Sequence, residues 1–495
     1  MSFDFQKINE DFKKINSNIR IYSDLLIEKS LDVWNIKTKV GLFFFSLGLS
    51  ILATYLLSPD EFSKAQEYTM FILIFAILLW VTEAIPPFAV GIMIMGFLIY
   101  TMGNIEGSTM DPKTISNTWS DSVIWIFLGG FFLSEGMRKT SLDISLFRGT
   151  ISIFGSKPGY MLLGIMLTTS CLSLIISNTA TSAMILAAVM PFLEREGKDS
   201  PMTKAILISI PASATFAGMG SLISSPPNLI VVDALKSKGI DVSFFDWMIL
   251  GLPVAIVMLL FFWLILKQKY TSKVDKVDLD FLEEQEPLPS KIKLQRLFVI
   301  IILVVTVIFW MMGAKLNIPT AATAGIPIMF LPMLGIITAE DIRKLPWDTL
   351  MLVAGGLSLG IAIKELLAPY YSQMLGDVQF NGYLMMIIFA IVTIIFSNIM
   401  SSTATATIVI NIAAVVLPPE QILPIGLVIG LCASCGLFLP VSTPPNAIVY
   451  STGMLKQSDF YLGGFYGALF GTIVIILWVL FLQQFTGYFE MVLNL

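Results

Sequence analysis

Two short polar runs decide the fold of this chain: SNTATS at residues 177–182 and SSTATA at residues 401–406. Both lie in sequence that is otherwise almost entirely apolar. Serine and threonine side chains on membrane helices usually hydrogen-bond to their own backbone or to a neighbouring helix, so helix packing alone would explain one such run. Two matching runs, each followed by a helix-breaking Pro-Pro pair, indicate a polar site inside a membrane protein.

The composition around these runs is that of a polytopic membrane protein. Of the 495 residues, 56% are hydrophobic and only 13% are charged, whereas about 25% are charged in an ordinary soluble domain. Apolar stretches suited to crossing about 30 Å of hydrocarbon recur along the chain, for example at 40–57, 70–85, 161–176, 250–266 and 297–312. The first ~40 residues are polar and charged, which is too long for the n-region of a cleaved signal peptide.

Two basic segments predict the orientation in the membrane. We expect a polar arm at 1–40, a first membrane half at 41–266, a polar linker at 267–294 and a second membrane half at 295–495. The arm and the linker region carry the basic residues Lys7, Lys13, Lys14, Arg20, Lys29, Lys37, Lys39, Lys267, Lys269, Lys273, Lys276, Lys291, Lys293 and Arg296. By the positive-inside rule both segments face the cytoplasm, and a bacterial plasma membrane is the expected location.

Four landmarks recur in the same order on either side of the linker: a Trp/Asp pair, Gly-Gly, the polar run, and Pro-Pro-Asn. The corresponding residues are Trp119, Asp121, Gly129, Gly130, Ser177, Pro226, Pro227 and Asn228, then Trp347, Asp348, Gly355, Gly356, Ser401, Pro444, Pro445 and Asn446. The second Gly-Gly, polar run and Pro-Pro follow the first by 226, 224 and 218 residues. We therefore predict an internal repeat, at 119–235 and 345–455, of the kind that places a transport site between its two copies.

The sequence contains no histidine. This excludes imidazole metal sites, histidine proton relays, and nucleophiles activated by histidine. The CxxC pair Cys432 and Cys435 has no second pair to complete a metal site, so we interpret these cysteines, like Cys171, as helix-packing residues. We expect no catalytic residue and no cofactor, apart from Na⁺ as a possible coupling ion.

The repeated motifs suit a small anion and a hard cation. Two consecutive prolines withdraw two backbone N–H groups and stop a helix, so the preceding carbonyls lose their partners. Inside a membrane such carbonyls need protein, water or an ion, and a ring of them can bind sodium. The hydroxyl and amide groups of the polar runs, placed at the start of a half-helix, can bind a carboxylate. Neither motif contains Lys or Arg, so anion binding would depend on bound cations.

The SNTAT…SPPN and SSTAT…LPVSTPPNAIV pairing, with Gly-Gly before each, resembles the divalent anion/sodium symporter family of di- and tricarboxylate transporters. The resemblance covers the chain after residue 40 and is most specific at LPVSTPPNAIVYSTG, residues 439–453. It implies an all-α polytopic protein with two inverted repeats, re-entrant hairpins, broken helices and about eleven crossings. It also implies a homodimer in which a transport domain moves like an elevator against a scaffold.

The resemblance implies site residues in both repeats. Substrate carboxylates would meet Ser177, Asn178, Thr179, Ser225, Ser401, Ser402, Thr403 and Thr443. The first sodium site would use Ser173, Ser177, Asn178 and the chain at Ser224, and the second would use Ser397, Met400, Ser402 and the chain at Ser442.

One position departs from the family pattern, because Ser402 stands where the second motif usually has asparagine. Serine is shorter and has no amide donor, which weakens the second sodium site and one substrate contact. If Lys364 pointed at this site, its ammonium could replace a sodium ion. Lys364, Glu365, Glu135 and Arg138 could equally lie at hairpin ends, reaching the interface or pairing with one another.

The expected function is secondary active transport of dicarboxylates of the succinate, malate, fumarate and 2-oxoglutarate class, coupled to sodium. Sodium-independent exchange is the alternative favoured by Ser402 and Lys364. An intramembrane hydrolase with a Ser/Lys pair is a remote alternative, since repeated Pro-Pro-Asn has no role in it. A channel would need a ring of carbonyls or charges, and no nucleotide-binding loop supports a pump. The expected partners are the substrate, the lipid bilayer and a second copy of the chain, with no nucleic acid.

Overall fold

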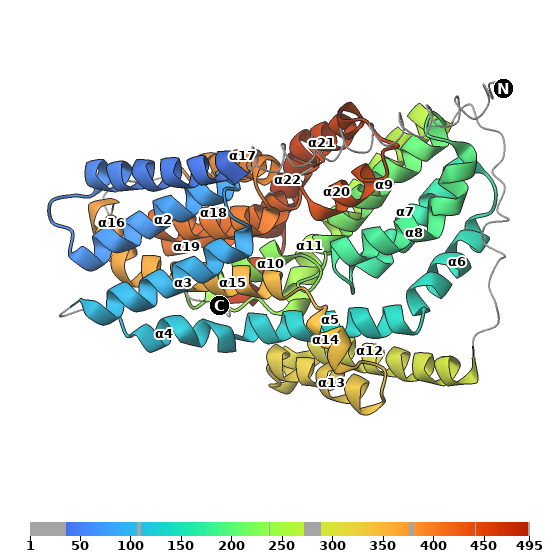
Figure 1. Cartoon of the computed structure of the whole chain (residues 1–495), viewed down its shortest axis with the longest axis horizontal. Coiled ribbons are helices and arrows are strands. Elements are labelled where there is room, and N and C mark those ends of the chain that lie inside the picture. Colours follow the sequence, from blue (N-terminus) through green and yellow to red (C-terminus); the bar gives the residue numbers. More distant parts are fainter. Residues whose placement is uncertain are drawn as a thin grey trace, which may run out of the picture.

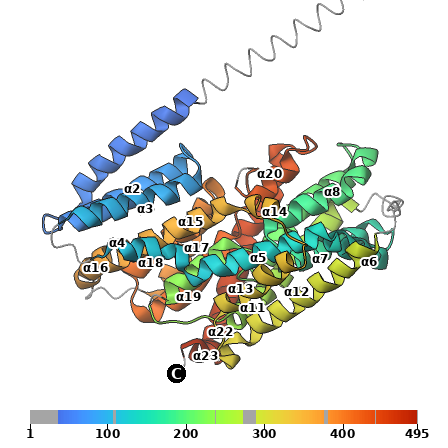
Figure 2. The same ribbon diagram turned by 60° about the horizontal axis from the view of Figure 1, so that its bottom comes forward.

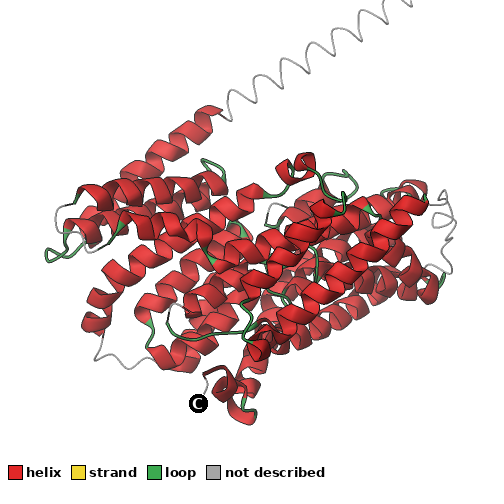
Figure 3. Cartoon of the chain, turned by 90° about the horizontal axis from the view of Figure 1, so that it is seen from below, coloured by secondary structure: helices red, strands yellow, loops and turns green. Residues whose placement is uncertain are grey.

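The computed structural model describes residues 36–105, 110–236, 238–271, 289–375, 381–440 and 442–493. These residues form helices and short connections without strands (Figure 3), so the predicted all-α fold is confirmed. The predicted N-terminal arm up to residue 35 and the linker residues 272–288 lie outside the described residues.

The first half of the membrane region contains a helix at Ile36–Leu57 and ten further helices. These are α2 (Lys64–Thr82), α3 (Pro87–Asn104), α4 (Pro112–Ser116), α5 (Ser122–Lys139), α6 (Leu142–Phe154), α7 (Pro158–Ser173), α8 (Asn178–Glu196), α9 (Pro201–Gly218), α10 (Pro226–Lys236) and α11 (Phe244–Leu266). The segment Asn117–Ser120 forms a 3₁₀ turn before α5, and Lys267–Thr271 continues α11 as a π-helical turn.

The second half repeats this order of elements. It contains α12 (Ser290–Leu316), α13 (Thr320–Met333), α14 (Ala339–Arg343), α15 (Trp347–Ala362), α16 (Ala368–Leu375), α17 (Gly382–Ile399), α18 (Ser402–Val416), α19 (Pro419–Ala433), α20 (Pro444–Tyr450), α21 (Tyr461–Phe465), α22 (Thr472–Phe485) and α23 (Tyr488–Leu493). A π-helical turn, Ile363–Leu367, joins α15 to α16.

The connectivity makes the second half inverted relative to the first. The helix at Ile36–Leu57 has no counterpart in the second half. After it, the two halves share one order: three crossing helices (α2, α3 and α5, or α12, α13 and α15), a helical hairpin (α7–α8 or α17–α18), a broken helix (α9–α10 or α19–α20) and a last crossing helix. Because a hairpin returns to the side from which it entered, each of these repeated units crosses the membrane an odd number of times. Eight helices of the described residues are long and apolar enough to span a membrane by composition alone.

The helices pack in two groups, and each group contains elements of both halves. In the first group α3 packs on α15 and α5 packs on α13 (Figure 1). The approach of α3 and α15 depends on glycine, because a Cβ on Gly355 would lie 2.3 Å from the Cα of Gly91. The second Gly-Gly landmark is therefore a helix-packing site.

The second group consists of the hairpins and the broken helices. Each hairpin packs against the broken helix of its own half, and its second arm also contacts the opposite half: α8 meets α20, and α18 meets α10 (Figures 1 and 2). These contacts between the two halves bring the two polar runs toward one region of the molecule.

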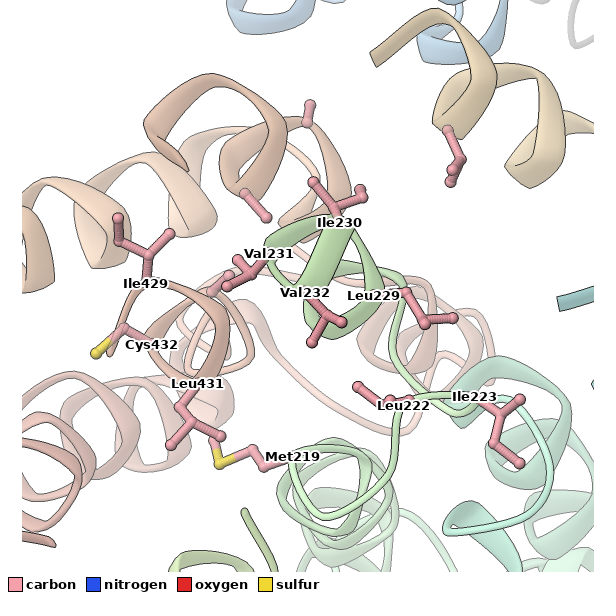
Figure 4. Close-up of a cluster of buried hydrophobic side chains, with 14 of the residues drawn as sticks. Met219, Leu222, Ile223, Leu229, Ile230, Val231, Val232, Ile429, Leu431 and Cys432 are labelled. Carbon is pink, nitrogen blue, oxygen red and sulfur yellow. The ribbon is translucent and has the colours of Figure 1, made fainter. Parts of the chain in front are cut away.

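Several of these helices begin with proline, at positions where the missing backbone N–H costs no hydrogen bond. α7, α9, α10, α19 and α20 each carry proline in the first turn, where an N–H has no intrahelical partner. Leu222 and Ile223, in the connection between α9 and α10, are buried and belong to an apolar cluster that also includes Leu229 of α10 and Ile429 of α19 (Figure 4). Cys432 belongs to this apolar cluster as a buried free thiol.

Candidate functional site

The two polar runs form equivalent hairpin tips. Ser177 caps α8, its hydroxyl accepting a hydrogen bond from the backbone N–H of Ala180 at 3.3 Å. Ser401 caps α18 in the same way, accepting from Ala404 at 3.2 Å. Serine at an N-cap leaves the remaining first-turn N–H groups free to bind a ligand. Both tips therefore end in a helix start with positive polarity.

The Pro-Pro-Asn segments fix the breaks in the two broken helices. The side-chain Nδ2 of Asn228 donates to the carbonyls of Gly218 at 2.9 Å and Ser221 at 2.8 Å. In the other repeat the Nδ2 of Asn446 donates to the carbonyl of Leu439 at 2.9 Å. Each asparagine thus ties the start of its own half-helix to backbone carbonyls of the chain that precedes the break.

The tips and the breaks line one cavity, called here the central cavity, with a volume of about 570 Å³. Its lining includes all eight residues predicted to contact substrate: Ser177, Asn178, Thr179, Ser225, Ser401, Ser402, Thr403 and Thr443. The opposite wall comes from the first group of helices through Pro87, Phe88, Phe127, Phe131, Pro346, Asp348, Thr349 and Leu352.

A direct hydrogen bond joins the two repeats at the edge of this cavity. The hydroxyls of Ser225 and Ser434 lie 3.2 Å apart, and both side chains are buried. Ser225 belongs to the first break and Ser434 follows α19 of the second repeat. The breaks from the two halves therefore meet, as a site built at a repeat interface requires.

The lining of the central cavity carries hydroxyl and amide groups on largely apolar walls, and it contains no lysine or arginine among the described residues. The helices α8, α10 and α18 of the second group begin there, and α3 and α15 of the first group begin at the opposite wall. Asp348 of α15 is the ionisable side chain in the lining. Hydroxyl groups, an amide and helix N-termini can bind carboxylates, but they leave the charge of a dianion uncompensated.

The predicted first cation site is compact and oxygen-rich. The Ser173 hydroxyl lies 2.6 Å from Oδ1 of Asn178 and 3.0 Å from the carbonyl oxygen of Ala214. The Ser224 hydroxyl donates to the carbonyl of Gly218 at 3.1 Å. Gly218 leaves room for the Asn178 side chain, because a Cβ on residue 218 would lie 2.6 Å from Oδ1 of Asn178. Ser177, Asn178 and Ser224 also line the central cavity, whereas Ser173 is buried behind it.

The predicted second cation site has the same layout with different side chains. The Ser397 hydroxyl donates to the carbonyl of Ala433 at 2.5 Å, and the Ser442 hydroxyl donates to the carbonyl of Asn398 at 3.1 Å. Met400 is the buried residue between the two arms of the hairpin. Ser402 lines the central cavity, whereas Ser397, Met400 and Ser442 lie outside its lining.

Two site atoms were missed by sequence reasoning. The Oδ1 atoms of Asn228 and Asn446 are buried and have no hydrogen-bond partner within the described residues. A buried amide oxygen without a donor costs about 1–3 kcal/mol, unless a cation or water occupies the space beside it. The 218-residue spacing of these asparagines was visible in the sequence, but it indicated a helix break rather than a spare oxygen.

Residues that sequence reasoning missed also include Thr215, Ser434 and Asp348, which line the central cavity. Asp348 is itself a landmark of the second repeat and Ser434 lies ten residues before Pro444, but spacing alone gave no reason to place their side chains in the site. Within the described residues there is no cluster of Cys, Asp and Glu suited to hold a transition metal.

The charged residues near the Gly-Gly landmarks lie away from the central cavity. Arg138 and Glu135 pair with each other, with a closest N···O distance of 2.5 Å, which confirms their pairing. Lys364 lines a different cavity of about 160 Å³ together with Asp233, Lys238 and Glu365. Because Lys364 is not in the lining of the central cavity, this structure gives no support to its replacing a sodium ion there.

The chain matches the family described as the sodium:sulfate symporter transmembrane region over residues 39–492. It is 28% identical to a sodium-dependent dicarboxylate transporter, SdcS, of Staphylococcus saprophyticus, over 91% of this chain and 92% of that protein. It is 27% identical to SdcS of Staphylococcus aureus strain USA300, over 88% of this chain and 89% of that protein. The solved YdaH transporter of Alcanivorax borkumensis has a TM-score of 0.53 at 12% identity, covering 80% of this chain and 98% of its own.

Proposed function

Because the chain belongs to the sodium:sulfate symporter family, we propose that it is a sodium-coupled secondary transporter of C4 and C5 dicarboxylates such as succinate, malate, fumarate and 2-oxoglutarate. The family match confirms the predicted divalent anion/sodium symporter resemblance and a transporter rather than an enzyme. The hydrolase alternative is wrong on this ground.

The observation that carries the proposal is the meeting of both hairpin tips and both helix breaks in the central cavity. A dicarboxylate has two anionic ends, and the two repeats offer two matched sets of hydroxyl groups and helix N-termini. Ser177, Asn178 and Thr179 would hold one carboxylate, and Ser401, Ser402 and Thr403 would hold the other. The names of the SdcS relatives support both the dicarboxylate and the sodium ion.

The absence of fixed cations in the lining explains why sodium would be needed. Without a lysine or arginine beside it, a dianion in a cavity of low polarity lacks charge compensation. Sodium ions held behind the tips by Ser173, Asn178 and Ser224, and by Ser397, Met400 and Ser442, would supply it. Binding of the anion and of the cations would then be mutually dependent, which is the thermodynamic requirement for coupling.

We propose an elevator motion of the second group of helices against the first. The hairpins and broken helices carry the ligand-binding residues of both repeats, whereas the first group supplies an apolar wall with Phe127 and Phe131. A rigid group that carries the whole site can slide along such a wall without breaking the site.

Exchange of one dicarboxylate for another without sodium is the second candidate function. Ser402, which lines the central cavity, lacks the amide that Asn178 provides at the equivalent position. A second cation site without this oxygen would bind sodium more weakly, so the exchange reaction would depend less on the ion.

The proposed orientation in the membrane rests on the positions of the basic residues, and the proposed oligomeric state rests on the family. We propose a homodimer in the plasma membrane with a cytoplasmic N-terminus. On this orientation the tip of α7–α8 is reached from the cytoplasm and the tip of α17–α18 from outside. Native mass spectrometry in mild detergent tests the dimer, and labelling of a cysteine at Lys37 with an impermeant reagent tests the orientation.

The experiment that tests the function uses the purified protein in liposomes without internal anion. Uptake of labelled succinate should require external sodium and should stop when choline replaces it. Uptake that continues in choline, or that needs internal dicarboxylate, would replace symport by exchange. No saturable flux of any dicarboxylate under either condition would contradict the substrate class.

A further inference from the structure

A second groove runs along the first hairpin and joins the central cavity. It has a volume of about 600 Å³ and lies between α8 on one side and α5 and α6 on the other. Its lining shares Ala180 and Ala183 with the central cavity. The two spaces are therefore adjacent along one face of α8.

The faces of α5 and α8 show that the groove and the cavity form one path. On α5, Phe127 and Phe131 line the cavity, and Ser134 and Arg138 line the groove. Their spacing of four, three and four residues places them on one helix face. On α8 the exposed small residues Ala183 and Ala187 lie one turn apart on the face that lines the groove.

Among the charged groups at the outer part of this path are four cations, Arg138, Lys139, Arg148 and Arg296, and three carboxylates, Glu135, Asp143 and Asp341. Arg138 and Arg148 line the groove, and Asp143 is the acidic residue in its lining. Of the other charged groups at this end, Glu135 pairs with Arg138, and Lys139 pairs with Asp341 at 2.7 Å. Arg296 donates to the carbonyl of Thr140 at 2.8 Å and to that of Ser141 at 3.0 Å. The Arg138 side chain remains 62% exposed.

We propose that this groove is the entrance for the dianionic substrate from the side of the α7–α8 hairpin, with Arg138 and Arg148 as the residues that attract it. The proposal rests on the function proposed above. Apolar walls of low dielectric focus the field of the two guanidinium groups along the groove. The binding cavity itself holds no fixed cation, so the arginines raise the local concentration of the anion without trapping it.

The first test needs no transported substrate. A single cysteine at Ala187, in a Cys171→Ser background because Cys171 is exposed, reports on the groove through its reaction with anionic and cationic methanethiosulfonates. Arg148→Gln should lower the ratio of anionic to cationic reaction rates about threefold at low salt, and Arg148→Lys should restore it. Lys198→Gln is the matched control, since Lys198 is exposed between α8 and α9 and lines neither space.

The second test measures transport from one face at a time. In oriented liposomes the Arg138→Gln/Arg148→Gln variant should raise KM for succinate several-fold on the hairpin face, with Vmax and the KM of the opposite face unchanged. Labelling of Ala187→Cys should slow transport. An unchanged reagent ratio in Arg148→Gln, the same shift in Lys198→Gln, or equal KM changes at both faces would overturn the proposal. A normal reagent shift without sodium-dependent flux would instead count against the proposed function alone.

Discussion

At the scale of single residues, one amide per repeat organises the site. Asn228 and Asn446 use their Nδ2 groups to hold the broken backbone and keep a buried Oδ1 without a protein donor. Asn178 has a different role, because its Oδ1 lies beside the Ser173 hydroxyl and its residue lines the central cavity. These positions permit separate predictions for binding and for stability.

Replacing Asn178 by alanine should abolish most substrate uptake. The change removes the amide at the hairpin tip and the acceptor of the 2.6 Å hydrogen bond from Ser173. Loss of one such interaction with a charged ligand costs about 2 kcal/mol, or roughly a 30-fold loss of affinity. Uptake into liposomes measures it, with Asn104→Ala at the exposed end of α3 as the control. Wild-type uptake by the Asn178→Ala protein would contradict the assignment.

Replacing Asn228 by alanine should destabilise the protein and reduce its response to sodium. The carbonyl of Ser221 loses its donor, and the carbonyl of Gly218 keeps only weaker ones, including the Ser224 hydroxyl, which costs about 1–3 kcal/mol. A ligand that binds only the folded state raises the unfolding temperature. We expect a smaller rise on addition of sodium than for the wild type, measured by thermal unfolding in detergent. A lower unfolding temperature with a full sodium response would limit Asn228 to a structural role.

At the scale of elements, close helix contacts and one ion pair hold the parts of the protein in place. The α3–α15 contact depends on Gly91 and Gly355. At the end of α5, Lys139 pairs with Asp341 of α14, which also accepts two hydrogen bonds from Thr338. The short helix α14 is thereby fixed beside α5.

Replacing Gly355 by alanine should lower the unfolding temperature, because the new Cβ would lie 2.3 Å from the Cα of Gly91. Overpacking of this kind costs about 1–3 kcal/mol. Gly96→Ala on α3 is the matched control, since no atom lies within 4 Å of a Cβ placed there. Equal unfolding temperatures for the two variants would show that the helices do not approach as described.

The Lys139–Asp341 pair should stabilise the fold at neutral pH and lose its effect in acid. Burial alone would raise the pKa of Asp341, but the hydrogen bonds from Lys139 and Thr338 outweigh it and lower this pKa to about 2. A carboxyl group with a pKa lower in the folded state than in the unfolded state stabilises above the unfolded pKa, and the effect disappears as pH falls from about 4 to 2. Asp341→Asn should therefore unfold earlier than the wild type at pH 7, with the difference reduced at pH 3.

The sequence predicted the elements of the site better than its atoms. The duplicated runs predicted both hairpin tips, and all eight residues predicted to contact substrate line one cavity. It could not predict that Asn228 keeps a spare oxygen, or that Lys364 lines another cavity. Both depend on side-chain direction within a helix, which the order of motifs does not determine. The groove beside α8 was missed because Arg138 and Arg148 belong to separate helices.

At the scale of the whole molecule, helices of one repeat pack against helices of the other repeat in both groups. α8 meets α20 and α18 meets α10 in the group that carries the site, while α3 meets α15 and α5 meets α13 in the other. These contacts between the repeats place the polar tips of the two halves around one cavity. They also separate the helices that carry the predicted binding residues from those that form the wall, as the proposed elevator motion requires.

The central claim is that the two hairpin tips hold one dicarboxylate between them. A cryo-electron microscopy map of the protein with succinate and sodium tests it most directly. We expect succinate in the central cavity, with one carboxylate at residues 177–179, the other at residues 401–403, and a cation behind at least the first tip. Succinate bound elsewhere, or touching one tip alone with the other turned away, would contradict it.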